Sequence, residues 1–217
     1  MLNTLIIVLA AILLPGLLYY DNRVNQKGLL LTKTVLSLLF VIAALVQPHP
    51  ISVYYYCLLV GLTFCLGGDI FLALRKKMMF LFGLIFFLIG HIFYIFGFFY
   101  VAQSSQWTWV GLLTMLVISV WVYFWLRPHL GSMKAPVVLY VIAITIMLSG
   151  AWSALGDSDL AQPGRIMVFA GALSFYFSDI FVARDRFLQK EFLNRVIGLP
   201  MYYTGQFLLA FSVGLLR

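Results

Sequence analysis

Hydrophobic residues fill the chain in long stretches that short polar breaks separate. Each stretch is about 20 residues long, the length that an α-helix needs to cross the hydrocarbon core of a bilayer. The breaks are rich in turn residues such as Pro48, Pro50, Pro128 and Gly164, and no connection is long enough to fold as a separate domain. The pattern predicts eight membrane-spanning helices near residues 2–20, 28–46, 51–74, 78–100, 107–126, 135–153, 163–183 and 196–216.

The composition agrees with a polytopic membrane protein. Of the 217 residues, 64% are hydrophobic and 10% are charged, and the mean hydropathy is +1.04. Soluble domains are roughly half apolar and a quarter charged. We therefore expect one all-α transmembrane domain over residues 1–217, with its chemistry inside or at the edge of the bilayer. The first stretch lacks the positive segment that precedes a signal peptide, so we expect it to remain as a helix.

Lysine and arginine residues are concentrated in alternate connections, and this asymmetry predicts the orientation. The connections after the first, third, fifth and seventh helices hold eleven cations, and the opposite side holds Arg165 and Arg217. We expect the eleven to face the cytoplasm and both termini to lie outside. The net charge of +7 then reflects topology and attraction to anionic membrane lipids, and no nucleic-acid motif is present. Small size and short loops suggest a bacterial inner membrane.

Two similar sequence motifs lie at the ends of the third and seventh predicted helices: Asp69-Ile70-Phe71-Leu72-Ala73 and Asp179-Ile180-Phe181-Val182-Ala183. The two aspartates are 110 residues apart, and a basic loop and a returning helix follow each of them. This pattern predicts two parallel-related four-helix halves, residues 1–104 and 105–217. An axis along the membrane normal would relate the halves and bring the two aspartates to equivalent positions around a shared centre.

The two aspartates and Lys33 are predicted to lie in one layer. Asp69 precedes Arg75 by six residues and Asp179 precedes Arg184 by five, which places both carboxylates roughly 8–9 Å inside the cytoplasmic helix ends. Lys33 lies at a similar depth, where acids and base can offset each other's desolvation. Because ionisable residues in membrane spans are functional by default, we predict a functional aspartate pair. The alternatives are a structural hydrogen bond or ion pair, with Lys33 reaching instead to the interface.

Other polar residues are candidates to line a cavity beside the aspartates: His91, Tyr94, Ser178, Tyr202, Tyr203 and Gln206. Small residues such as Gly61, Gly68, Gly90 and Gly171 let their helices approach closely and turn the acids towards the bundle interior. The alternative for each polar candidate is hydrogen bonding between helices. Three scattered histidines without carboxylate–histidine spacing predict no metal site, and no phosphate-loop, dinucleotide or serine-hydrolase motif indicates a cofactor or nucleophile.

Together, these residues resemble the YhhN family of lysoplasmalogenases, which includes the animal lysoplasmalogenase membrane proteins. The residues that carry the resemblance are Lys33, Gly68-Asp69, His91-Ile92-Phe93-Tyr94, the run from Ser178 to Ala183 ahead of Arg186-Phe187, and Tyr202-Tyr203 with Gln206. Their order and spacing cover nearly the whole chain. Thr34 departs from the family pattern, in which proline often follows the lysine.

The resemblance implies hydrolysis of the vinyl ether bond of lysoplasmalogens, which releases a fatty aldehyde and glycerophospho-ethanolamine or glycerophosphocholine. A buried carboxylic acid can protonate the β-carbon of the vinyl ether, and an ionised carboxylate can stabilise the cation and deprotonate water. Two carboxylates that share a site tend to divide into these two states. As a hypothesis, Asp69 and Asp179 form this pair and Lys33 keeps one of them ionised. The sequence leaves open which is the acid.

A lysophospholipid substrate would place its tail between the helices and its phosphate at the cytoplasmic surface. The predicted phosphate ligands are Arg75, Lys76, Arg184, Arg186 and Arg195. The scissile ether lies a few bonds from the headgroup, which is the depth inferred for the aspartates. We therefore expect the site to open on the cytoplasmic face.

Two other functions remain open. Gly67-Gly68-Asp69 is similar to the G-x-G-D motif of intramembrane aspartyl proteases, but Leu66 occupies the position of the first glycine. A small proton-coupled transporter is the stronger alternative, because duplicated halves with central acids are also the architecture of carriers. Solute flux without hydrolysis would favour the carrier.

Overall fold

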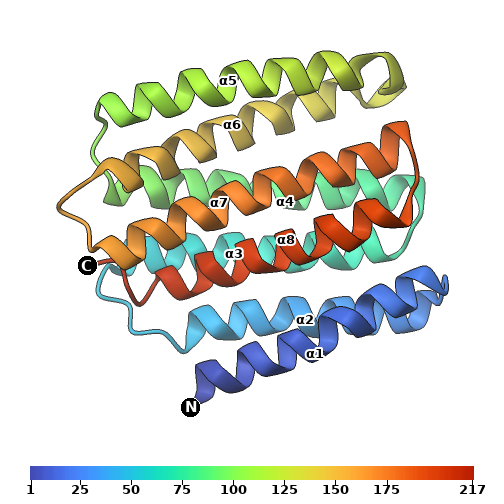
Figure 1. Ribbon diagram of the computed structural model, residues 1–217, viewed down its shortest axis with the longest axis horizontal. Coiled ribbons are helices and arrows are strands. Elements are labelled where there is room, and N and C mark those ends of the chain that lie inside the picture. Colours follow the sequence, from blue (N-terminus) through green and yellow to red (C-terminus); the bar gives the residue numbers. More distant parts are fainter.

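The computed structural model describes residues 1–217 apart from the side chain of Lys77, and it is an all-α bundle (Figure 1). Its helices are α1 (Leu2–Asn22), α2 (Gln26–Leu45), α3 (Ser52–Ala73), α4 (Lys77–Val101), α5 (Gln106–Leu126), α6 (Lys134–Gly156), α7 (Gln162–Ala183) and α8 (Phe192–Ser212). Two short 3₁₀ turns, η1 (Arg127–His129) and η2 (Gly131–Met133), join α5 to α6, and a π-helical turn, η3 (Arg184–Leu188), follows α7. The all-α prediction is confirmed, and the predicted helix ends agree to within a few residues.

Seven helices, α1 to α7, are long and apolar enough to cross a membrane, judged by length and composition. These spans make the chain an integral membrane protein. Helix α8 is less apolar because it carries polar residues such as Asn194, Tyr202 and Gln206, which are buried against other helices. Both termini lie at the same end of the bundle (Figure 1). The eighth span, the outside position of the termini and the bacterial inner membrane stay predictions.

The helices pack as neighbouring antiparallel pairs around a shared hydrophobic core. The most extensive packing joins α3 to α4 and α7 to α8, while α6 lies against α4, α5 and α7. Helix α2 packs on α3 and α8, and α1 lies at the edge of the bundle on α2 (Figure 1). This arrangement brings the ends of α3 and α7, which carry the two aspartates, next to α2, α6 and α8.

Close glycine contacts hold the two tightest pairs together. A Cβ atom added to Gly90 would lie 3.1 Å from the carbonyl oxygen of Gly61, and one added to Gly205 would lie 2.8 Å from that of Gly171. Gly61 and Gly171 each precede the aspartate of their own helix by eight residues. The two contacts therefore occupy matching places in α3–α4 and α7–α8, which supports the predicted duplication; the duplication itself stays a prediction.

Replacing Gly205 by alanine is expected to destabilise the protein. The new methyl group would lie 2.8 Å from the Gly171 carbonyl oxygen and 3.1 Å from the Phe175 backbone nitrogen, and neither backbone atom can rotate away. Overpacking of this kind costs about 1–3 kcal/mol. Thermal unfolding in detergent measures the loss, with Gly16→Ala as the control because a Cβ there meets nothing within 4 Å. Equal melting temperatures for the two variants would contradict the close approach of α7 and α8.

Candidate active site

Asp69 is held inside the bundle by a cation and two hydroxyl groups. Its side chain is 1% exposed, and Oδ1 lies 3.1 Å from the Nζ atom of Lys33 on α2. The hydroxyls of Ser37 and Tyr202 donate to Oδ2 at 2.6 and 2.7 Å. Tyr203 adds a contact of 3.2 Å between its hydroxyl and that of Ser37. Lys33 therefore points to Asp69 and not to the helix end.

Asp179 has a different set of partners. It lies one turn before the end of α7, and the Tyr140 hydroxyl of α6 donates to its Oδ2 at 2.6 Å. Among the described side chains, no lysine, arginine or histidine lies within ion-pair distance of Asp179. One aspartate thus has a cationic partner, and the other has a neutral one.

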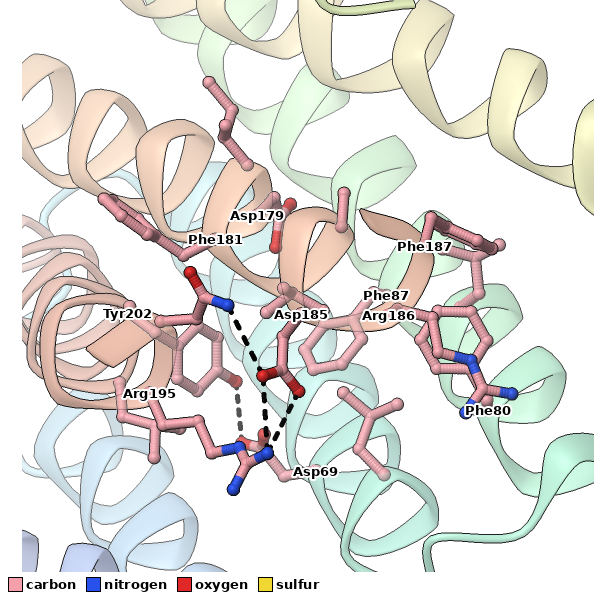
Figure 2. A pocket seen from close by; sticks show the side chains of 18 of the residues that line it. Asp69, Phe80, Phe87, Asp179, Phe181, Asp185, Arg186, Phe187, Arg195 and Tyr202 are labelled. Carbon is pink, nitrogen blue, oxygen red and sulfur yellow. Dashed lines mark hydrogen bonds and ion pairs between the residues drawn. The ribbon is translucent and has the colours of Figure 1, made fainter. Parts of the chain in front are cut away.

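Both aspartates line the same cavity, which has a volume of about 310 Å³. Figure 2 shows the Tyr202 hydroxyl directed at Asp69 and places Asp179 on α7 along the same pocket. All eight helices contribute lining residues, and these come from the half of each helix next to the basic loops. Lys33, Tyr140 and Tyr202 also line the cavity, so each carboxylate faces it together with its partners.

An ion-pair network crosses the mouth of this cavity. Asp21, the buried acid near the end of α1, lies 2.6 Å from Arg75 and 2.9 Å from Arg195. Arg195 also approaches Asp185 of η3 at 3.3 Å (Figure 2). Carboxylates of this chain thus already neutralise Arg75 and Arg195, two of the five cations predicted to bind phosphate.

The other three predicted phosphate ligands differ in position. Lys76 and Arg186 line the cavity and have no ion-pair partner among the described side chains. The Arg186 guanidinium lies over the Phe80 ring, 4.4 Å from its centroid. Arg184 does not line the cavity, and it binds Glu191 at 3.1 Å and Asn194 at 2.6 Å.

The YhhN family model matches residues 29–213 of the chain. The chain belongs to the YhhN family. Lysoplasmalogenase TMEM86A of Bos taurus is 30% identical over 158 residues, which cover 70% of this chain and 63% of the Bos taurus protein. The chain thus spans less than two thirds of the length of that relative. The chain matches no solved structure. The family predicted from the sequence is confirmed.

Several predicted residues of this YhhN protein lie behind the cavity and do not line it. The Tyr94 hydroxyl donates to Gln206 Oε1 at 2.8 Å, and both side chains are fully buried. Ser178 donates to the carbonyl of Phe175 in its own helix at 2.8 Å. These hydrogen bonds lie within and between helices, which is the alternative role given above for the polar candidates. Tyr203 likewise reaches Asp69 only through Ser37.

His91 is fully buried and packs against the partner of Asp179. Its ring meets that of Tyr140 edge-on, with centroids 4.9 Å apart, and it lies 4.8 Å from the Phe175 ring. Neither ring nitrogen has a hydrogen-bond partner among the described residues. His91 does not line the cavity, so in this YhhN protein it contacts the site through Tyr140.

Three residues of the site, Ser37, Tyr140 and Asp21, were not predicted from the sequence. Ser37 follows Lys33 by one helical turn, and the i, i+4 spacing indicated the same face. Tyr140 lies six residues after Lys134, where α6 begins, and counting depth places it in the layer of the aspartates. No comparable signal marked Asp21, since only the fold brings the end of α1 to the two arginines.

Proposed function

We propose that this YhhN protein is an intramembrane hydrolase that cleaves the vinyl ether bond of a lysoplasmalogen. The products are a fatty aldehyde and glycerophospho-ethanolamine or glycerophosphocholine. The observation that carries the proposal is a pair of aspartates that line one cavity with unlike partners, Lys33 for Asp69 and Tyr140 for Asp179. The family and the name of the Bos taurus relative support the same reaction.

The unlike partners support different roles for the two aspartates. Asp69 is the carboxylate, since Lys33 and two hydroxyl donors stabilise a negative charge on it. Asp179 is the acid, since removal from water disfavours a charge that no nearby cation offsets. Two carboxyl groups in different environments can therefore act as acid and base in one step.

The reaction begins when Asp179 gives its proton to the β-carbon, leaving an oxocarbenium ion at the carbon bonded to oxygen. Asp69 stabilises this cation and takes a proton from the water that attacks it, which forms a hemiacetal. Asp69 then returns its proton to the glycerol oxygen as the carbon–oxygen bond breaks. The hemiacetal hydroxyl gives its proton to Asp179 and becomes the aldehyde carbonyl. One water is consumed, and both carboxyl groups regain their starting states.

The mouth of the cavity suits a phosphate-bearing headgroup. Lys76 and Arg186 line it and keep their charges free of ion-pair partners among the described side chains. Arg75 and Arg195 line it too, but they would bind phosphate only in exchange for Asp21. Lys76 and Arg186 are therefore the proposed phosphate ligands, and Arg184 is omitted.

The proposed reaction has an isotopic signature that tests it directly. Detergent-purified protein is incubated with a lysoplasmenyl lipid in deuterium oxide or in oxygen-18 water, and the products are analysed by mass spectrometry. We expect a single deuterium on the carbon next to the aldehyde group, because that carbon receives the proton of the acid. We also expect no oxygen-18 in the glycerol hydroxyl, because water attacks the vinyl carbon. Label in the glycerol hydroxyl would contradict the mechanism.

The absence of aldehyde from intact protein would reject the hydrolase and leave the small proton-coupled transporter as the function to test. The lining residues of the cavity come from one half of the bundle, and both aspartates lie in unbroken helices. Carrier sites more often lie where helices are interrupted near the midplane, so these features support the hydrolase. Solute flux into liposomes is the measurement that would support the carrier.

A further inference from the structure

The cavity has an apolar part that adjoins Asp179 between α4, α5, α6 and α7. The side chains that line this part, which we call the apolar slot, are Leu84, Val122, Leu126, Val137, Val141 and Ile144. The slot is continuous with the polar part at Lys33 and Asp69, and cations lie at the mouth. A cavity that is charged at one end and apolar at the other is complementary to an amphiphile.

The apolar slot has a closed end. The Ser119 hydroxyl lies 2.7 Å from that of Thr145 and 3.1 Å from that of Tyr176, so these hydroxyls satisfy one another across α5, α6 and α7. Ile144 lines the slot beside this cluster. One turn further along α6, Met147 and Leu148 are 0% exposed. Packed core therefore stops the slot before it reaches the opposite end of the bundle.

The slot is shorter than the chain of an ordinary membrane lipid. It runs along α5 from Leu126 to Ser119 and along α6 from Val137 to Ile144, and each segment rises about 10 Å. The hydrocarbon core of a bilayer is about 30 Å thick, so a chain that fills one leaflet spans about 15 Å. A full-length chain would thus meet the closed end before it was accommodated.

We propose that the apolar slot binds the hydrocarbon chain of the lysolipid and limits its length, with Ile144 as the residue that sets the limit. The position of the chain rests on the proposed function, because protonation by Asp179 places the chain carbons after the double bond beside the slot. Medium-length chains fit, and long chains must bend or protrude. Ile144 is thus a specificity-determining residue.

Binding of saturated acyl lysophosphatidylcholines tests the proposal. A series from octanoyl to stearoyl displaces a radiolabelled decanoyl lipid from the purified protein in one detergent. We expect affinity to be highest for medium chains. Ile144→Ala should move the optimum to longer chains and Ile144→Phe to shorter ones. Overpacking predicts at least about a fivefold change in affinity for the chains that no longer fit. The variant-to-parent ratio at each length cancels differences in micelle partition.

Ile146→Ala and Ile146→Phe are the matched controls, since Ile146 lies two residues away and is 38% exposed on the outer face of α6. Unchanged profiles in both Ile144 variants, equal shifts in the Ile146 variants, or undiminished binding of long chains would overturn the proposal. If Ile144→Phe does not fold, Ile144→Ala decides alone. These acyl lipids have no vinyl ether, so their binding does not depend on the reaction. A shifted binding profile without aldehyde release from a lysoplasmenyl lipid would reject the hydrolase and keep the slot. Aldehyde release with an unshifted binding profile would keep the hydrolase and reject the slot.

Discussion

Asp179→Asn is expected to lower the rate of aldehyde release by about 10²–10⁴-fold, the range that general acid catalysis contributes. Asparagine matches aspartate in shape, and its amide oxygen can accept the hydrogen bond that Tyr140 donates at 2.6 Å. The fold should therefore survive, while the proton for the β-carbon is lost. Single-turnover rates on a lysoplasmenyl lipid measure the effect on the chemical step.

Asp159→Asn is the matched control, since this carboxylate is exposed in the connection between α6 and α7. It should keep the parent rate. Tyr140→Phe removes the hydrogen bond but keeps the acid, so we expect a smaller loss than with Asp179→Asn. An Asp179→Asn protein that folds and turns over like the parent would exclude Asp179 as the acid.

Hydropathy predicted the elements well because the bilayer restricts a spanning chain to long apolar helices. The largest disagreement is at α8, which begins at Phe192, whereas the sequence placed the start near residue 196. Arg195 was assigned to a basic loop, yet it lies in the first turn of α8 and is neutralised by Asp21 and Asp185. A charge whose partners come from distant helices can lie within a helix, and hydropathy alone does not show this.

The sequence predicted those features of the candidate site that depend only on the depth of a residue along its helix. Counting residues from the basic loops placed Lys33 and Asp69 in one layer, and the structure brings them to 3.1 Å. The depth of a residue does not give its rotation around the helix axis. Depth therefore did not show that Lys33 forms an ion pair with Asp69 while Tyr140 donates a hydrogen bond to Asp179. The same limit explains the phosphate ligands: counting cations gave five candidates, but only the fold shows that Asp21 neutralises some of them.

Lys33→Met is expected to destabilise the folded protein by about 3–5 kcal/mol, because it removes one partner of a buried ion pair and leaves the other uncompensated. Asp69 is 1% exposed, so little solvent would compensate its charge once the ammonium group is gone. Methionine keeps a similar length and an apolar stem, so the loss reports the charge more than the packing. Thermal unfolding in detergent measures it, and the aldehyde assay should show lost activity in whatever protein folds.

The double variant Lys33→Met with Asp69→Asn separates stability from catalysis. Once both charges are gone, the desolvation cost of the lone carboxylate disappears, and replacing a buried ion pair by neutral groups is often nearly neutral for stability. The double variant should therefore unfold at a temperature closer to the parent than Lys33→Met does, a non-additive result typical of residues in contact. Ser37 and Tyr202 can still donate to the asparagine oxygen, which favours a preserved fold. Aldehyde release should remain absent, because the variant lacks Asp69, the group proposed to stabilise the cation and to deprotonate water. Restored stability with restored activity would show that Asp69 acts only as a structural partner of Lys33.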